Sequence, residues 1–272
     1  MATIAEKNRS KKKKGKDGAP KVIPPAPKFE PKSWLFLSLC GAGLGLSAPG
    51  FDHWYIAWFG LVPLILGSVS SPGKWQAYLR GFFFGTAYNL VYFNWLLGLQ
   101  PLDWLSFNGL EGWFLASFAC LFVSVQQGLI VGLFSLILRS IPLSGSFFVE
   151  KTQGQWKAPA LLAVPLLWVL VNNFIGNAHW MTGVPWSMLE YSQYKQVSFI
   201  QIASIIGGVG LGFLIVMTNA SIAALIGAIL KKRQFKSIAA ADKTTGFYQI
   251  LATVTILTGV LGYGFYKTAN SR

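Results

Sequence analysis

The sequence predicts an all-α, polytopic membrane protein with about seven transmembrane helices. Of its 272 residues, 53% are hydrophobic and only 12% are charged, and the mean hydropathy is +0.48. Such a composition is typical of membrane proteins, and a run of about 20 apolar residues crosses a bilayer core of roughly 30 Å. Seven apolar stretches of suitable length follow one another along the chain. They cover residues 33–48, 54–69, 81–99, 112–138, 158–174, 197–230 and 247–265.

Glycine spacing indicates how these stretches pack. Gly41, Gly43 and Gly45 lie in the first stretch, which is short, and further glycines lie in the sixth and seventh. Small residues let helix backbones approach closely in lipid, so we expect a compact bundle. The sixth stretch is long for a single span, and Gly207-Gly208 is expected to interrupt it.

The positions of the basic residues predict the orientation. The chain has 23 Lys and Arg against 9 Asp and Glu, a net charge of +14. Ten basic residues precede the first stretch, two lie between the second and third, three between the fourth and fifth, and five between the sixth and seventh; three remain for the other side. This asymmetry predicts a cytoplasmic N-terminus and an outer C-terminus. It explains the basic excess as a topology signal, so a nucleic-acid partner is not expected.

Three regions are expected along the chain. Residues 1–32 combine a lysine run with Ala, Pro and Gly and lack apolar periodicity, so a disordered basic cytoplasmic tail is predicted. Residues 33–265 form the transmembrane bundle, and residues 266–272 a short tail on the outer side. The basic tail is either a solvated topology anchor or a segment attracted to anionic lipid headgroups at about 1 kcal/mol per basic residue.

Amides are the main polar side chains within the apolar stretches. They are Asn89, Asn94, Gln126, Gln127, Asn172, Asn173 and Asn219. They either bond helices together, at about 0.6–2 kcal/mol each, or line a polar cavity for a lipid headgroup or a peptide. Ionisable residues are nearly absent from the stretches, which argues against an ion pump or a voltage sensor.

Few residues suggest catalysis or metal binding. Cys40 and Cys120 both fall inside apolar stretches, where thiols are usually packing groups. His53 and His179 lie near carboxylate-bearing outer loops, but spacing does not bring them together. We therefore predict no metal site, no cofactor and no catalytic set within these residues.

The segment between the fifth and sixth stretches is aromatic and rich in turn formers, and the orientation places it on the outer face. It contains Thr182-Gly183-Val184-Pro185-Trp186 followed by Tyr191-Ser192-Gln193. These two motifs resemble the signature of the apolipoprotein N-acyltransferase family. Other motifs resemble the family in the same order. They are Leu46-Ser47-Ala48-Pro49 through Asp52 and Trp54, Leu61-Val62-Pro63-Leu64, Gly81-Phe82-Phe83-Phe84-Gly85 leading to Asn94-Trp95, and Pro165-Leu166-Leu167-Trp168.

The resemblance covers residues 34–265, the membrane part of such enzymes, and within this part the fifth stretch departs from the family pattern. The family commonly has an acidic residue four positions after the tryptophan of the fifth stretch and a basic one seven positions after. Here those positions hold Asn172 and Ile175.

The resemblance implies transfer of an acyl chain from a phospholipid to the amino group of a diacylated lipoprotein N-terminus, in the bacterial cytoplasmic (inner) membrane. It implies substrate contacts by Thr182, Gly183, Pro185, Trp186 and Tyr191. The family's catalytic Glu-Lys-Cys set lies on a nitrilase-like domain that these residues do not include, so a separate nitrilase-like partner is expected. Two alternatives stay open: a non-catalytic lipid-binding or scaffold protein derived from the family, and a small transporter.

Overall fold

A computed structural model describes residues 31–107, 109–152, 154–175, 178, 185–230, 235, 238 and 243–270, and these residues are mostly helical. The first half of the chain folds into helices joined by short turns. In chain order they are α2 (Pro31–Gly45), the 3-10 helix η1 (Trp54–Trp58), α3 (Val62–Val69), α4 (Lys74–Tyr92), the 3-10 helices η2 (Phe93–Leu99) and η3 (Asp103–Leu105), and α5 (Leu110–Ser140).

A small sheet lies between α5 and the second half of the chain. The all-α prediction did not include this sheet. Its strands β1 (Leu143–Ser144), β2 (Glu150–Thr152) and β3 (Gln155–Pro159) are arranged in the order β1-β3-β2, with β1 and β3 parallel and β2 and β3 antiparallel. The all-α prediction is corrected on this point, because β3 pairs with both β1 and β2; Gly154, directly before β3, adopts a φ of 78°, which glycine allows without strain.

The second half begins with a helix that changes type along its length. The helices are α6 (Ala160–Trp168), the π-helix η4 (Val169–Ile175), the 3-10 helix η6 (Leu189–Gln193), α7 (Val197–Ile200), α8 (Ala203–Leu230) and α9 (Lys243–Asn270). The predicted interruption of the sixth stretch is confirmed, because Gly207 within α8 has a φ of 68° and a ψ of 174°, outside the helical region.

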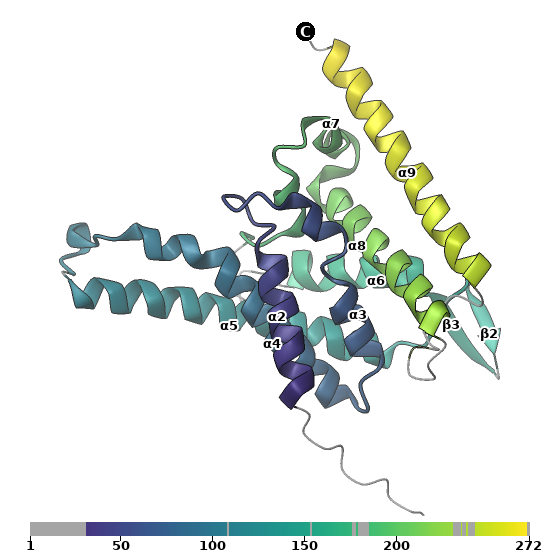
Figure 1. Ribbon diagram of the computed structural model, residues 1–272, viewed down its shortest axis with the longest axis horizontal. Coiled ribbons are helices and arrows are strands. Elements are labelled where there is room, and N and C mark those ends of the chain that lie inside the picture. Colours follow the sequence, from purple (N-terminus) through teal and green to yellow (C-terminus); the bar gives the residue numbers. More distant parts are fainter. Residues whose placement is uncertain are drawn as a thin grey trace, which may run out of the picture.

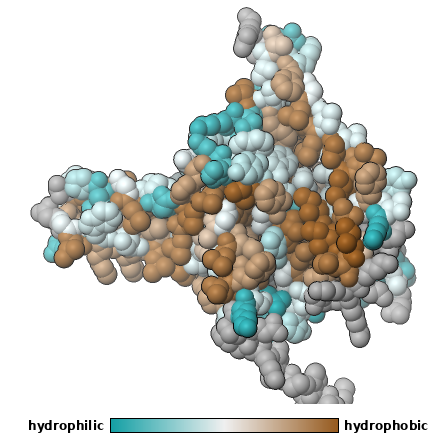
Figure 2. Space-filling model, viewed as in Figure 1, coloured by the Kyte–Doolittle hydropathy of each residue, from teal (hydrophilic) through white to brown (hydrophobic). Residues whose placement is uncertain are grey.

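Among the residues that the structure describes, three helices are long and apolar enough to cross a membrane by length and composition: α5, α8 and α9. The apolar stretches Trp54–Val69 and Ala160–Ile175 are shorter. Figure 2 shows hydrophobic residues gathered over the α8–α9 side and along the α5 hairpin. The structure therefore supports a helical membrane protein, whereas seven spans and the orientation of the termini stay predictions.

Close glycine contacts join the helices of the bundle. Gly81 of α4 lies so near α5 that an added Cβ would be 2.6 Å from the Val131 carbonyl oxygen. A Cβ added to Gly41 of α2 would be 2.1 Å from the Phe84 carbonyl oxygen of α4. Beyond these contacts, η2 and the N-terminal part of α5 project sideways as a hairpin (Figure 1).

Buried polar side chains fix the turns between helices. Asn219 of α8 is fully buried; it accepts a hydrogen bond from the Leu61 backbone N–H (2.9 Å) and donates to the Ala57 carbonyl (2.9 Å). Arg80 of α4 is 8% exposed and donates to the Gly67 carbonyl (2.8 Å) near the end of α3. Asn219 thus holds the η1–α3 turn against α8.

We expect Asn219→Ala to lower the free energy of unfolding by about 1–3 kcal/mol for each backbone group that it leaves unpaired. Thermal or denaturant unfolding of the protein in detergent measures the change. Thr218→Ala is the matched control, since Thr218 donates to Leu214 of its own helix (3.0 Å). Equal stability of the two variants would contradict this role of Asn219.

Candidate functional site

Three of the amides identified in the sequence line one pocket. The pocket is small, with a volume of about 10 Å³, and lies among α4, α5, the α6–η4 helix and the segment before η6. Its lining consists of Tyr88, Asn89, Gln127, Val131, Trp168, Asn172, Ser187, Met188 and Leu189. Of the two roles left open for the amides, this supports a polar cavity for Asn89, Gln127 and Asn172, whereas Asn219 bonds helices together.

Backbone bonds fix the orientation of two of these amides. Asn89 donates through Nδ2 to the Gly85 carbonyl (2.8 Å), and Asn172 donates through Nδ2 to the Trp168 carbonyl (3.2 Å). Asn89 is 1% exposed, and its Oδ1 has no hydrogen-bond partner in the described part of the chain. Buried polar atoms usually have partners, so this oxygen marks the pocket as chemically incomplete.

The non-helical segment before η6, residues 185–188, closes one side of the pocket; this segment together with η6 and residues 194–196 is called the rim. Tyr88 of α4 donates its hydroxyl to the Ser187 carbonyl (3.0 Å). Met188 and Leu189 are buried beside it. The segment is therefore held by α4 rather than by its own secondary structure.

Glu190 follows directly and is 7% exposed. It accepts a hydrogen bond from Asn173 Nδ2 of η4 (3.2 Å at Oε1) and lies against α8, where a Cβ added to Gly212 would be 2.6 Å from Oε2. Burial raises the pKa of this carboxyl, and the hydrogen bond from Asn173 partly opposes the rise. Glycine on α8 is what makes room for a carboxyl group here.

Gln193, at the end of η6, joins the rim to η1. It is 1% exposed, donates through Nε2 to the Trp54 carbonyl (3.1 Å) and accepts from Trp58 Nε1 (3.2 Å). Trp58 in turn packs edge-on against Phe199 of α7, with ring centroids 4.9 Å apart. One amide thus aligns η1, η6 and α7.

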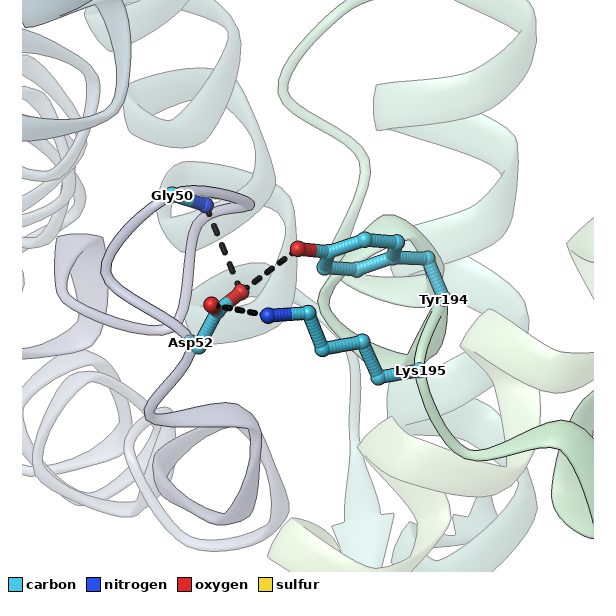
Figure 3. Close-up of polar contacts among 4 residues, drawn as sticks. All are labelled: Gly50, Asp52, Tyr194 and Lys195. Carbon is cyan, nitrogen blue, oxygen red and sulfur yellow. Dashed lines mark hydrogen bonds and ion pairs between the residues drawn. The ribbon is translucent and has the colours of Figure 1, made fainter.

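A second connection lies on the exposed surface of the same loops (Figure 3). Asp52 pairs with Lys195 and accepts a hydrogen bond from the Tyr194 hydroxyl (2.7 Å) and from the Gly50 backbone N–H (3.4 Å). The hydrogen bonds from Lys195 and Tyr194 lower the pKa of the Asp52 carboxyl. Asp52 therefore acts as an ionised clasp between the α2–η1 loop and the residues after η6.

The substrate residues implied by the resemblance lie at the outside of this rim, as far as they are described. Trp186 is 47% exposed and contacts the Trp95 ring at 5.6 Å; Pro185 and Tyr191 are also exposed. Thr182 and Gly183 lie outside the described residues, as does His179. The exposed side chains surround the pocket but do not line it.

Sequence reasoning missed the buried contacts. The sequence predicted an outer-face turn for the segment that holds Glu190 and Gln193. It gave no signal that Asp52 pairs with Tyr194 and Lys195, which lie more than 140 positions away. His53 contacts Tyr55, with 3.3 Å between Nδ1 and the hydroxyl. Within the described ranges, no three His, Cys, Asp or Glu side chains group as metal ligands would.

Comparison with known proteins identifies the family. Residues 40–221 match the apolipoprotein N-acyltransferase N-terminal domain. The chain belongs to the apolipoprotein N-acyltransferase family. The resemblance drawn from the sequence motifs is thereby confirmed, and the matched range contains every residue of the pocket and the described rim.

Curated apolipoprotein N-acyltransferases from several bacteria are similar to the chain. The protein from Gloeobacter violaceus is 31% identical over 186 residues, covering 67% of the chain and 32% of that protein. The one from Nostoc sp. is 26% identical over 230 residues (82% and 41%), and the one from Thermotoga maritima 28% over 187 residues (68% and 34%). The chain thus spans about a third to two fifths of the length of these relatives.

The lowered pKa of Asp52 predicts an acid-sensitive rim in this family member. A carboxyl with a depressed pKa contributes stability above its unfolded pKa and loses that contribution as the pH falls through its folded pKa. Hydrogen-exchange protection of residues 191–196 should therefore fall at acid pH, and Asp52→Asn should show the low protection at every pH. Glu150→Gln, on the remote strand β2, is the control; unchanged protection in Asp52→Asn would contradict the clasp.

The raised pKa of Glu190 predicts the opposite trend. Because the folded protein holds the Glu190 proton more tightly than the unfolded chain, the stability that Glu190 contributes is fully present at low pH and is lost as the pH rises from about 4.5 through the folded pKa. Glu190→Gln should remove this decrease and be more stable than the original protein at neutral pH, as measured by unfolding in detergent. The exposed Glu111→Gln is the control. A Glu190→Gln variant with the same pH dependence as the parent would refute the assignment.

Proposed function

We propose that these residues form the substrate-holding membrane domain of a phospholipid-dependent apolipoprotein N-acyltransferase, multi-pass in the bacterial cytoplasmic membrane. The observation that carries the proposal is the family match over residues 40–221, which includes both the amide-lined pocket and its aromatic rim. The three long apolar helices support membrane embedding.

The chemistry in this proposal proceeds through a thioester. The acyl carbon of a phospholipid ester passes to a cysteine thiol and the lysophospholipid hydroxyl leaves; the free amine of a diacylated lipoprotein then attacks the thioester, forming the amide and releasing the thiol. Cys40 lies in α2 and Cys120 in α5, where its thiol contacts the Phe93 carbonyl (3.5 Å). Neither is at the rim, so the proposal assigns the thiol to a nitrilase-like part.

The rim would then guide substrates between the lipid and that catalytic part. Trp186 and Tyr191 are exposed aromatic side chains, which favour the membrane interface. Pro185 precedes them in the turn, and Thr182 and Gly183 complete the motif. In this arrangement they contact acyl chains or the lipoprotein N-terminus.

Complementation tests this function. The chain is expressed in cells depleted of their own apolipoprotein N-acyltransferase, with and without a nitrilase-like partner, and lipoprotein N-termini are analysed by mass spectrometry. We expect triacylated lipoproteins when chain and partner are present together, and diacylated ones with either alone.

Alanine at Trp186 should reduce triacylation, and Trp156→Ala, an exposed tryptophan on β3, is the matched control. Lipoproteins that stay diacylated with every nitrilase-like partner would contradict the enzymatic proposal. The non-catalytic alternative, a lipid-binding scaffold, then predicts that phospholipid still copurifies with the chain.

A further inference from the structure

The small sheet lies at the end of α9 that is remote from the rim. Gln249, near the start of α9, donates through Nε2 to the Gly145 carbonyl directly after β1 (2.8 Å). Near the other end of α9, Gly264 lies against the Ser198 carbonyl of α7, the helix that follows the rim. Because α9 has 28 residues, these ends are about 42 Å apart (Figure 1).

Short connections hold the sheet close to the ends of the apolar helices. Two residues separate Ser140, at the end of α5, from Leu143 of β1, and β3 continues directly into α6 at Ala160. The sheet therefore begins within about 10 Å of the end of α5. Both α5 and α9 are long and apolar enough to cross a membrane. Since the headgroup layer is about 5–8 Å thick on each side, the sheet is within reach of lipid headgroups.

The hairpin of β2 and β3 has two different faces. Lys151 is opposite Trp156 in the antiparallel register, and Glu150 is opposite Lys157. Residues directly opposite share a face, and neighbours along a strand point to opposite faces. Lys157 therefore shares its face with a carboxylate, whereas the Lys151 ammonium lies over the Trp156 ring, 5.4 Å from the ring centroid. The face of Lys151 and Trp156 is both cationic and aromatic.

This face is open on the surface of the protein. Trp156 is 62% exposed, and two further apolar side chains directly before β2 are exposed as well, Phe148 by 80% and Val149 by 60%. Among the described residues, no carboxylate forms an ion pair with Lys151. The hairpin thus presents an uncompensated positive charge together with apolar surface.

Other basic residues lie at the same end of the bundle. Arg139, in the last turn of α5, donates to the Ser71 carbonyl in the α3–α4 turn (2.8 Å), which places Lys74 at the start of α4 at this end. Lys243 begins α9 on the other side of the sheet. Positive charge therefore surrounds the hairpin and complements an anionic surface.

We propose that the hairpin face formed by Lys151 and Trp156 docks on the anionic phospholipid headgroups of the surrounding bilayer. Tryptophan prefers the level of the headgroups, and a lysine beside it is attracted to their phosphates. A soluble acidic protein would match the charge as well, but α5 and α6 already hold the hairpin beside the bilayer. The inference goes beyond the proposed acyl transfer, because it concerns the end of the bundle that is remote from the rim.

The test is hydrogen exchange, measured by mass spectrometry on the purified full chain in two kinds of nanodisc. One contains phosphatidylcholine alone, and the other an equal mixture of phosphatidylcholine and phosphatidylglycerol. We expect the peptide that contains β2 and β3 to exchange about fivefold more slowly in the anionic nanodiscs, the effect of one lysine at an anionic surface. Sodium chloride at about 1 M should remove the difference, because it screens the attraction.

Lys151→Gln should abolish the difference between the two lipids, and Lys151→Arg should keep it, because arginine retains the charge. Lys267→Gln is the matched control: Lys267 also lies over an aromatic ring (Tyr263, 5.9 Å from the centroid), but near the other end of α9. Its hairpin should respond to phosphatidylglycerol as the parent does. Thermal unfolding in detergent establishes that each variant is folded.

Equal exchange in the two kinds of nanodisc would overturn the inference. If the hairpin exchanges slowly in both, it contacts lipid without recognising charge, and if it exchanges rapidly in both, the face is left for a soluble partner. A difference that Lys151→Gln retains would overturn it too. None of these measurements depends on acyl transfer, so their failure is distinct from a failure of complementation.

Discussion

The rim of this molecule depends on side-chain hydrogen bonds to backbone carbonyls, because the segment from Pro185 to Ser187 has no regular secondary structure of its own. Tyr88 holds it from α4 through Ser187, and Gln193 holds its far end to η1 through Trp54. Both donors are buried, and breaking either bond would leave a polar group without water to replace it. The site therefore keeps its shape only while these few bonds persist.

Helix packing brings those donors within reach. Glycines along α4 and α5 let the two helices approach, which places Asn89 and Gln127 on one cavity wall. On the opposite side, Gly212 lets α8 approach Glu190. A larger side chain at Gly212 would meet the carboxyl group first, so the small residues shape the site as much as the polar ones do.

The sequence predicted helices, the Gly207 break, the family and a possible amide-lined cavity, because apolar length, glycine and motif order are local signals. It did not predict the sheet, whose strands have only two to five residues, or the changes of helix type at Phe93 and Val169. Nor did it predict the long-range pairs. Asp52 and Lys195 are ordinary loop residues until the fold joins their loops, and Glu190 reads as solvent-facing until α8 covers it.

The π-helix after Trp168 contains both positions at which the fifth stretch departs from the resembled family pattern, Asn172 and Ile175. Consecutive residues of η4 contact different partners: Asn172 lines the pocket and Asn173 binds Glu190. The family's acidic position in this helix is an amide here, whereas a carboxyl group arrives from the rim through Glu190. Glu190 is itself buried, and burial raises the pKa of its carboxyl, so ionising this acid at the rim also carries a desolvation cost. The neutral amides keep the cavity polar without that cost.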